Sequence, residues 1–172
     1  VEIGLPETGW KIIGDPEQAK HAPLGIVDGQ FSMPFCAAVT LREGGMVWDD
    51  YARHIGDEET LDLTRRVHTA PDPKAEAEFP NNLSAVVRVK TARGDYEAFV
   101  AVPRGEPGNF LKPEELRAKF DGLVGPYLPP ARVDELASRL LAIHKEDDIN
   151  EVLRLTRPVS VEVQGELVAA GE

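Results

Sequence analysis

Hydrophobic and polar positions change period several times along the chain, which indicates a mixture of strands and helices. Residues 1–5 alternate between apolar and polar side chains and predict a strand. The clearest alternation lies at residues 83–91 and 96–102, on either side of a turn that contains glycine, and predicts a β-hairpin. Residues 10–14 are interpreted as a second short extended piece, and residues 15–29, which are rich in proline, glycine and charge, as a long loop.

The segment from Asp28 to Gly45 predicts the helix around which the chain is organised. Small and apolar side chains follow a polar loop there and end at a glycine pair, a common helix terminator. Ser32 is placed to cap this helix, and Pro34 suits its first turn. We expect the N-terminal end, with Gln30 and Ser32 beside free backbone N–H groups, to suit an anionic ligand. One face of the predicted helix carries Phe31, Phe35, Ala38 and Val39.

Further helices are predicted on both sides of the hairpin. A short one covers residues 48–55, another runs from its cap Asp57 toward the prolines at residues 71–73, and residues 74–79 supply one or two helical turns. Three helices with apolar stripes follow from Pro113 onward. We therefore predict an α+β fold for residues 1–157, a small antiparallel sheet with a hairpin packed against several helices. Residues 158–172 alternate again and are interpreted as either an added edge strand or a disordered tail.

Composition and charge narrow the classes of partner. The chain has 172 residues, which suits one domain, and its net charge of −11 disfavours nucleic acid and anionic membrane surfaces. The sequence contains neither a signal peptide nor an apolar run of membrane-spanning length. The one cysteine, Cys36, excludes an internal disulfide framework and favours a reducing, cytoplasmic setting. Because the chain starts without methionine inside a predicted strand, we expect it to be a piece of a longer protein or a processed product.

The histidines are the candidate acid–base groups. His21 and Lys20, in the loop ahead of the organising helix, would suit a carboxylate ligand, and the alternative is that both are solvated loop residues. His68 lies just before a proline break and is a candidate for lining a cleft. His54 is expected to face solvent, and His144 to pack on an apolar helix stripe.

Other chemical signatures are weak. The sequence has no nucleophile elbow, glycine-rich phosphate loop, H-E-x-x-H or C-x-x-C pattern. Runs of neighbouring carboxylates stand near helix starts, where caps and solvated faces explain them, so we assign no metal. These runs are Asp49-Asp50, Asp57-Glu58-Glu59 and Glu146-Asp147-Asp148.

Two blocks of sequence carry a resemblance to a known family. The first is Gln30-Phe31-Ser32-Met33-Pro34-Phe35-Cys36-Ala37-Ala38-Val39, closing on Glu43-Gly44. The second is Gly105-Glu106-Pro107-Gly108-Asn109, followed by Pro113-Glu114-Glu115-Leu116 and Lys119-Phe120. In this order the blocks resemble the signatures of the MmgE/PrpD family, the 2-methylcitrate dehydratase-like proteins. The resemblance extends from Val1 to Leu155.

The resemblance implies a fold and a class of reaction. Members have a large helical domain and a smaller C-terminal α+β domain that acts as a lid, and this chain is similar to the lid. Known activities are dehydration of 2-methylcitrate, decarboxylation of cis-aconitate and epimerisation of iminodisuccinate, without metal or organic cofactor. We therefore expect a cofactor-independent dehydratase that removes a proton next to a carboxylate of a polycarboxylate and expels water. The alternatives are an epimerase or decarboxylase of the same family, or a stand-alone domain that binds a ligand or partner without catalysis.

The resemblance also implies which residues belong to this domain's part of the site and which lie in the helical domain. The main catalytic residues are expected in a helical domain, in the same protein or a partner subunit, so the isolated domain is predicted to be inactive. On this chain, Gln30 and Ser32 are the predicted carboxylate donors, and Phe31 the apolar wall. Lys20 and His21 are further substrate-binding candidates, and His68 is a candidate catalytic group. Family members commonly form homodimers, which the resemblance implies here as well.

Overall fold

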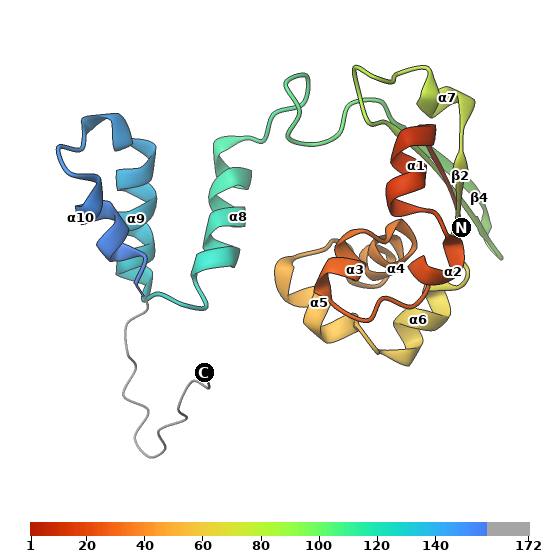
Figure 1. Ribbon diagram of the computed structural model, residues 1–172, viewed down its shortest axis with the longest axis horizontal. Coiled ribbons are helices and arrows are strands. Elements are labelled where there is room, and N and C mark those ends of the chain that lie inside the picture. The colour runs from red at the N-terminus through yellow and green to blue at the C-terminus, as the bar shows by residue number, and fades with distance from the viewer. Residues whose placement is uncertain (158–172) are drawn as a thin grey trace, which may run out of the picture. The chain divides into compact units, whose positions relative to one another are not determined.

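The structure is a computed structural model that describes residues 1–157 and groups them into two compact units (Figure 1). The first unit spans Val1–Leu111, and the second begins at Lys112. The single domain predicted for residues 1–157 stays a prediction, and the predicted tail at residues 158–172 lies outside the described residues. The elements of the first unit are β1 (Glu2–Leu5), α1 (Glu7–Ile13), α2 (Glu17–Lys20), α3 (Ile26–Gln30), α4 (Met33–Glu43), α5 (Trp48–His54), α6 (Glu58–Thr64), β2 (His68–Pro71), α7 (Pro73–Glu76), β3 (Ala85–Thr91) and β4 (Gly94–Val100).

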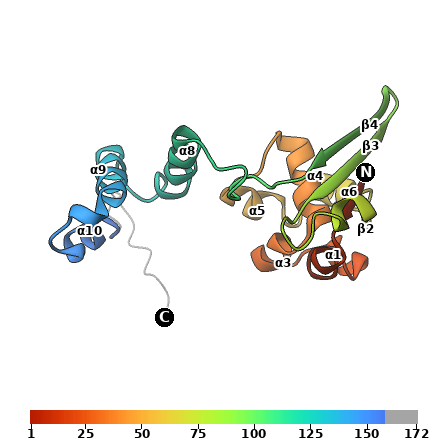
Figure 2. The same ribbon diagram turned by 90° about the horizontal axis from the view of Figure 1, so that it is seen from above.

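The described strands form one mixed sheet in the order β2-β1-β3-β4. β1 runs parallel to β2, with Glu2 opposite His68, and antiparallel to β3, with Ile3 opposite Val87. β3 and β4 form the predicted hairpin, which extends away from the helices in Figure 2. The α+β class is confirmed, but the sheet is not purely antiparallel, because the parallel strand β2 joins it. The sequence pattern instead predicts that these residues end a helix, since four residues are too few to show an alternation.

The core of the first unit lies between the sheet and the helices. Ile3, Leu5 and Val67 are buried at its centre. The partly buried residues packed against them are Val1, Trp10, Ile13, Met33, Ala37, Ala85 and Val87. On the other face of β1, a Cβ added at Gly4 would lie 2.3 Å from the Cβ of Asp72, so only glycine allows this close approach.

Two predictions in the N-terminal part are wrong. Residues 10–14 are not extended, because Trp10 and Ile13 lie one helical turn apart in α1 and pack together on the core. The Trp10 indole N–H also donates to the Thr69 carbonyl over 3.2 Å. Residues 15–29 are not one long loop, since α2 and most of α3 lie there. Both helices are very short and carry no apolar stripe long enough to show a period.

The predicted organising helix is α4, and its ends are as expected. The Ser32 hydroxyl accepts from the Phe35 N–H over 3.1 Å, and Gly44 ends the helix with a φ of 77°. Phe35, Ala38 and Val39 are fully buried. Phe31 differs from the prediction because it lies before the helix and is 49% exposed.

Both structural predictions for the remaining histidines are wrong. His54 is buried, with its Nδ1 2.7 Å from the Thr60 hydroxyl and its Nε2 3.2 Å from the Glu43 carboxylate. The hydrogen bond to Thr60 on α6 holds this side chain inside the fold, and the charged residues next to His54 in the sequence give no sign of that contact. His144 is exposed rather than packed, because α9 (Pro130–Leu141) ends before it and the chain continues in a short 3-10 helix, η1 (Ile143–Lys145).

The second unit contains the three predicted terminal helices, which are confirmed. They are α8 (Pro113–Val124), α9 and α10 (Ile149–Leu155). Leu128, Val133, Leu136 and Val152 form their buried core. Arg139 on α9 pairs with Glu146 over 2.6 Å and fixes the turn toward α10. Across residues 1–157, no helix has the length and apolar content that crossing a membrane requires.

Candidate functional site

The short helix α2 lies at the centre of the candidate site, and hydrogen bonds hold it on two sides. The Lys20 ammonium donates to the Ile12 carbonyl at the end of α1 over 2.8 Å. The Lys20 carbonyl accepts from the Ser32 hydroxyl over 2.5 Å, which ties α2 to the start of α4. A helix of one turn has little stability of its own, so these bonds decide where its side chains lie.

An open pocket of about 480 Å³ lies on one side of α2. Its lining combines apolar walls with one cation and one carboxylate, Lys20 and Asp28. The Asp28 carboxylate accepts from the Leu24 N–H over 3.1 Å, which partly offsets its negative charge. The remaining lining residues are Ile12, Ala19, Ala22, Leu24, Val27 and Phe31. Phe31 thus supplies part of an apolar wall, and Lys20 supplies a positive charge beside it.

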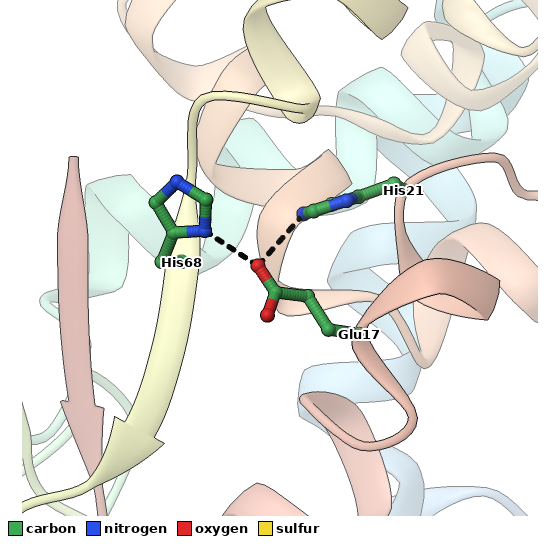
Figure 3. A group of neighbouring side chains, drawn as sticks. All are labelled: Glu17, His21 and His68. Carbon is green, nitrogen blue, oxygen red and sulfur yellow. Dashed lines mark hydrogen bonds and ion pairs between the residues drawn. The ribbon is translucent and has the colours of Figure 1, made fainter.

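A second group of side chains gathers on a different face of α2. Glu17 and His21, one turn apart on α2, meet His68 at the start of β2 (Figure 3). The Glu17 carboxylate oxygen lies 2.5 Å from His68 Nδ1 and 3.5 Å from His21 Nε2. The same His21 nitrogen lies 3.0 Å from the Val67 carbonyl. Because a carbonyl only accepts, His21 Nε2 carries the proton in this arrangement.

His68 also borders a smaller pocket, of about 190 Å³, beside the sheet. Asp72 and Arg88 line the same pocket, and their side chains pair over 2.8 Å. Hydrogen bonding from the Arg88 guanidinium lowers the pKa of Asp72, so this carboxylate is ionised at neutral pH. His68 therefore contacts the Glu17 carboxylate and also borders a pocket that contains an ion pair.

Ser32 and Gln30 lie in very different surroundings, although both were predicted to bind substrate. Ser32 is fully buried, and its hydroxyl caps α4 and donates to Lys20. Gln30 ends α3 and is exposed, next to Phe31. The start of α4 is thus closed to solvent, since Pro34 is also buried. Of the predicted substrate-binding residues, Lys20, His21, Gln30 and Phe31 have side chains that a molecule in solvent can reach.

Sequence reasoning missed Glu17, which links the two histidines. The available signal was the spacing of Glu17 and His21, because residues four apart face the same side of a helix. That signal needed α2 to be recognised as a helix. The third member, His68, is brought there by β2 pairing with β1, a long-range contact that no local pattern reveals.

Comparison with known protein families gives a match that covers most of the chain. A family model described as the MmgE/PrpD C-terminal domain matches residues 1–143. This range includes the whole first unit, with both groups of side chains around α2, and reaches η1 in the second. No curated protein matches the chain.

Proposed function

The chain belongs to the MmgE/PrpD family, and from that premise we propose that it is the smaller domain of an enzyme acting on a polycarboxylate. The observation that carries the proposal is the pocket beside α2, where the Lys20 ammonium lies among apolar walls. An ammonium has three N–H donors, so its bond to the Ile12 carbonyl leaves capacity for a carboxylate. Exposed Gln30 adds a neutral donor beside Phe31.

The reaction we propose resembles 2-methylcitrate dehydration. A base removes a proton from the carbon next to a carboxylate, and the hydroxyl group on the neighbouring carbon then takes up a proton from an acid and leaves as water. Cations that hold the carboxylate stabilise the charge that develops on it. Lys20 would supply one such contact, and a helical domain, in the same protein or a partner subunit, would supply the base. Epimerisation or decarboxylation by the same kind of site is the alternative outcome.

Lys20 and Asp28 carry opposite charges in the same pocket and allow a paired test. We expect Lys20→Met in the full protein to raise the KM for the polycarboxylate about tenfold, the effect of losing one charged hydrogen bond of roughly 1.5 kcal/mol. Asp28→Asn, which removes the opposing charge from the same pocket, should lower KM or leave it unchanged. Lys11→Met is the matched control, because Lys11 is exposed and pairs with Glu7.

The measurement begins with a binding screen of di- and tricarboxylates against the full protein, followed by steady-state kinetics on the tightest ligand. Gln30→Ala should raise KM or lower kcat several-fold. If Lys20→Met and Lys11→Met give the same kinetics, the pocket does not hold the substrate. His21 and His68 stay predictions as a substrate contact and an acid–base group. Because His21 and His68 already contact Glu17, Lys20 and Gln30 are the first residues to test.

A stand-alone binding domain is the rival function. It would bind a polycarboxylate without turnover even when a helical domain is supplied, whereas the enzyme would turn over only with that domain.

We also propose a cytoplasmic setting and a homodimer. Burial raises the pKa of the Cys36 thiol, which keeps the lone cysteine protonated and favours a structural role in a reducing compartment. Size-exclusion chromatography with light scattering tests the dimer.

A further inference from the structure

Glu17, His21 and His68 make up a set of side chains that the polycarboxylate proposal does not require. None of the three lines the pocket beside α2, which Ala19 and Lys20 do line. The set comes from two elements, a helical turn and the parallel strand β2. Two imidazoles and one carboxylate are among the commonest ligands of zinc-class cations in proteins.

The distances are close to those that such a cation needs. Each side chain offers a ligand atom within 4.8 Å of the other two. Donors around a tetrahedral Zn²⁺ lie about 3.3 Å apart, given bonds of about 2.0–2.1 Å. The 3.5 Å between Glu17 and His21 already fits this spacing. The 2.5 Å between Glu17 and His68 is a hydrogen-bond distance, so the His68 ring would move back by roughly 0.8 Å to admit the ion.

The surroundings permit that adjustment. The side chain of His68 is 61% exposed and that of Glu17 42% exposed, so both can shift without disturbing the core. His21 is more enclosed, at 16%, and gives the set one fixed member. The two rings meet nearly edge to face, at 76°, with centroids 6.2 Å apart, so they converge on Glu17 rather than stack. Binding needs the lone pair of His21 Nε2, so the neutral ring would move its proton to Nδ1 and release the Val67 carbonyl.

We propose that Glu17, His21 and His68 bind one first-row divalent cation of the zinc class. Three protein ligands leave a fourth position for water or another oxygen ligand. Imidazole ligands favour Zn²⁺ or Co²⁺ over Mg²⁺, which takes oxygen ligands. The ion would link α2 to β2 and stabilise a helical turn that has little stability of its own. This inference concerns a different ligand from the polycarboxylate proposal and does not depend on Lys20 or Gln30, although His21 and His68 are candidates in both.

The test is a metal titration of the full protein after chelator treatment, in a buffer free of carboxylates. We expect one equivalent of Zn²⁺ by calorimetry and, for Co²⁺, a visible absorption band typical of a low-coordinate nitrogen and oxygen site. Mg²⁺ should give no saturable binding. Glu17→Gln keeps the size of the side chain, and His68→Ala removes an exposed ring. Each should weaken Zn²⁺ binding at least ~10-fold with an unchanged far-ultraviolet circular dichroism spectrum.

Matched controls separate this site from general surface chelation. His144→Ala removes an exposed imidazole from η1, and Glu7→Gln removes an exposed carboxylate from α1, so both should leave the affinity unchanged. Equal weakening by His144→Ala and His68→Ala would overturn the proposal. So would the absence of one-equivalent binding, which would make the group a hydrogen-bonded brace between α2 and β2. Neither result bears on polycarboxylate binding, since none is present in the titration.

Discussion

Replacing Ser32 with alanine tests whether one buried hydroxyl positions the candidate site. Its oxygen accepts from the Phe35 N–H over 3.1 Å and its proton goes to the Lys20 carbonyl over 2.5 Å. The side chain is fully buried, so water cannot readily replace it at the start of α4. Ser32→Ala therefore removes a helix cap and one of the bonds that hold α2.

The magnitude follows from these two bonds. Loss of an N-cap hydroxyl costs about 1 kcal/mol. The Lys20 carbonyl loses its partner in a partly buried position, which costs about 1 kcal/mol more. We expect the free energy of unfolding to fall by about 2 kcal/mol. The loss should come with weaker polycarboxylate binding, because Lys20 keeps only its bond to the Ile12 carbonyl.

The measurement is urea unfolding followed by tryptophan fluorescence. The protein has two tryptophans, Trp10 and Trp48, and both lie in the first unit, so the signal reports on the part of the chain that holds Ser32. Thr40→Ala is the control, since it removes an exposed hydroxyl bond to the Cys36 carbonyl on the same helix and should cost less than about 0.5 kcal/mol. Equal losses for the two variants would refute the reasoning.

Two further predictions concern other parts of the chain. Hydrogen bonds from the Thr60 hydroxyl and backbone N–H, and then from Arg42, lower the pKa of Asp57 from 3.8 to about 2. A lowered folded-state pKa contributes stability above pH 3.8 that is lost as the pH falls toward 2. Asp57→Asn should therefore make the free energy of unfolding depend less on pH in this range, as measured by urea titrations at successive pH values. Leu136→Ala in the second unit should cost about 2–4 kcal/mol, because Leu136 is 3% exposed. Leu141→Ala, at a position 77% exposed, should cost under about 0.5 kcal/mol; equal changes in the circular dichroism midpoint would contradict this.

Local chemistry was enough to predict the elements that are long or clearly capped. The Ser32 cap and the glycine at the end of α4 act within a few residues, so the sequence by itself located this helix. The hairpin of β3 and β4 was visible because seven-residue strands show a clear alternation. The residues of α4, together with those at 105–120, carried the resemblance to the family that the match over residues 1–143 confirms.

The short elements were decided only by tertiary structure. α2 and β2 have four residues each, too few for a helical or strand period to emerge, and their states depend on bonds to distant partners. The Lys20 carbonyl of α2 accepts a hydrogen bond from Ser32, and the pairing of β2 with β1 positions His68. The sequence could therefore nominate His21 and His68 separately, but only the folded sheet brings them to the same carboxylate oxygen of Glu17.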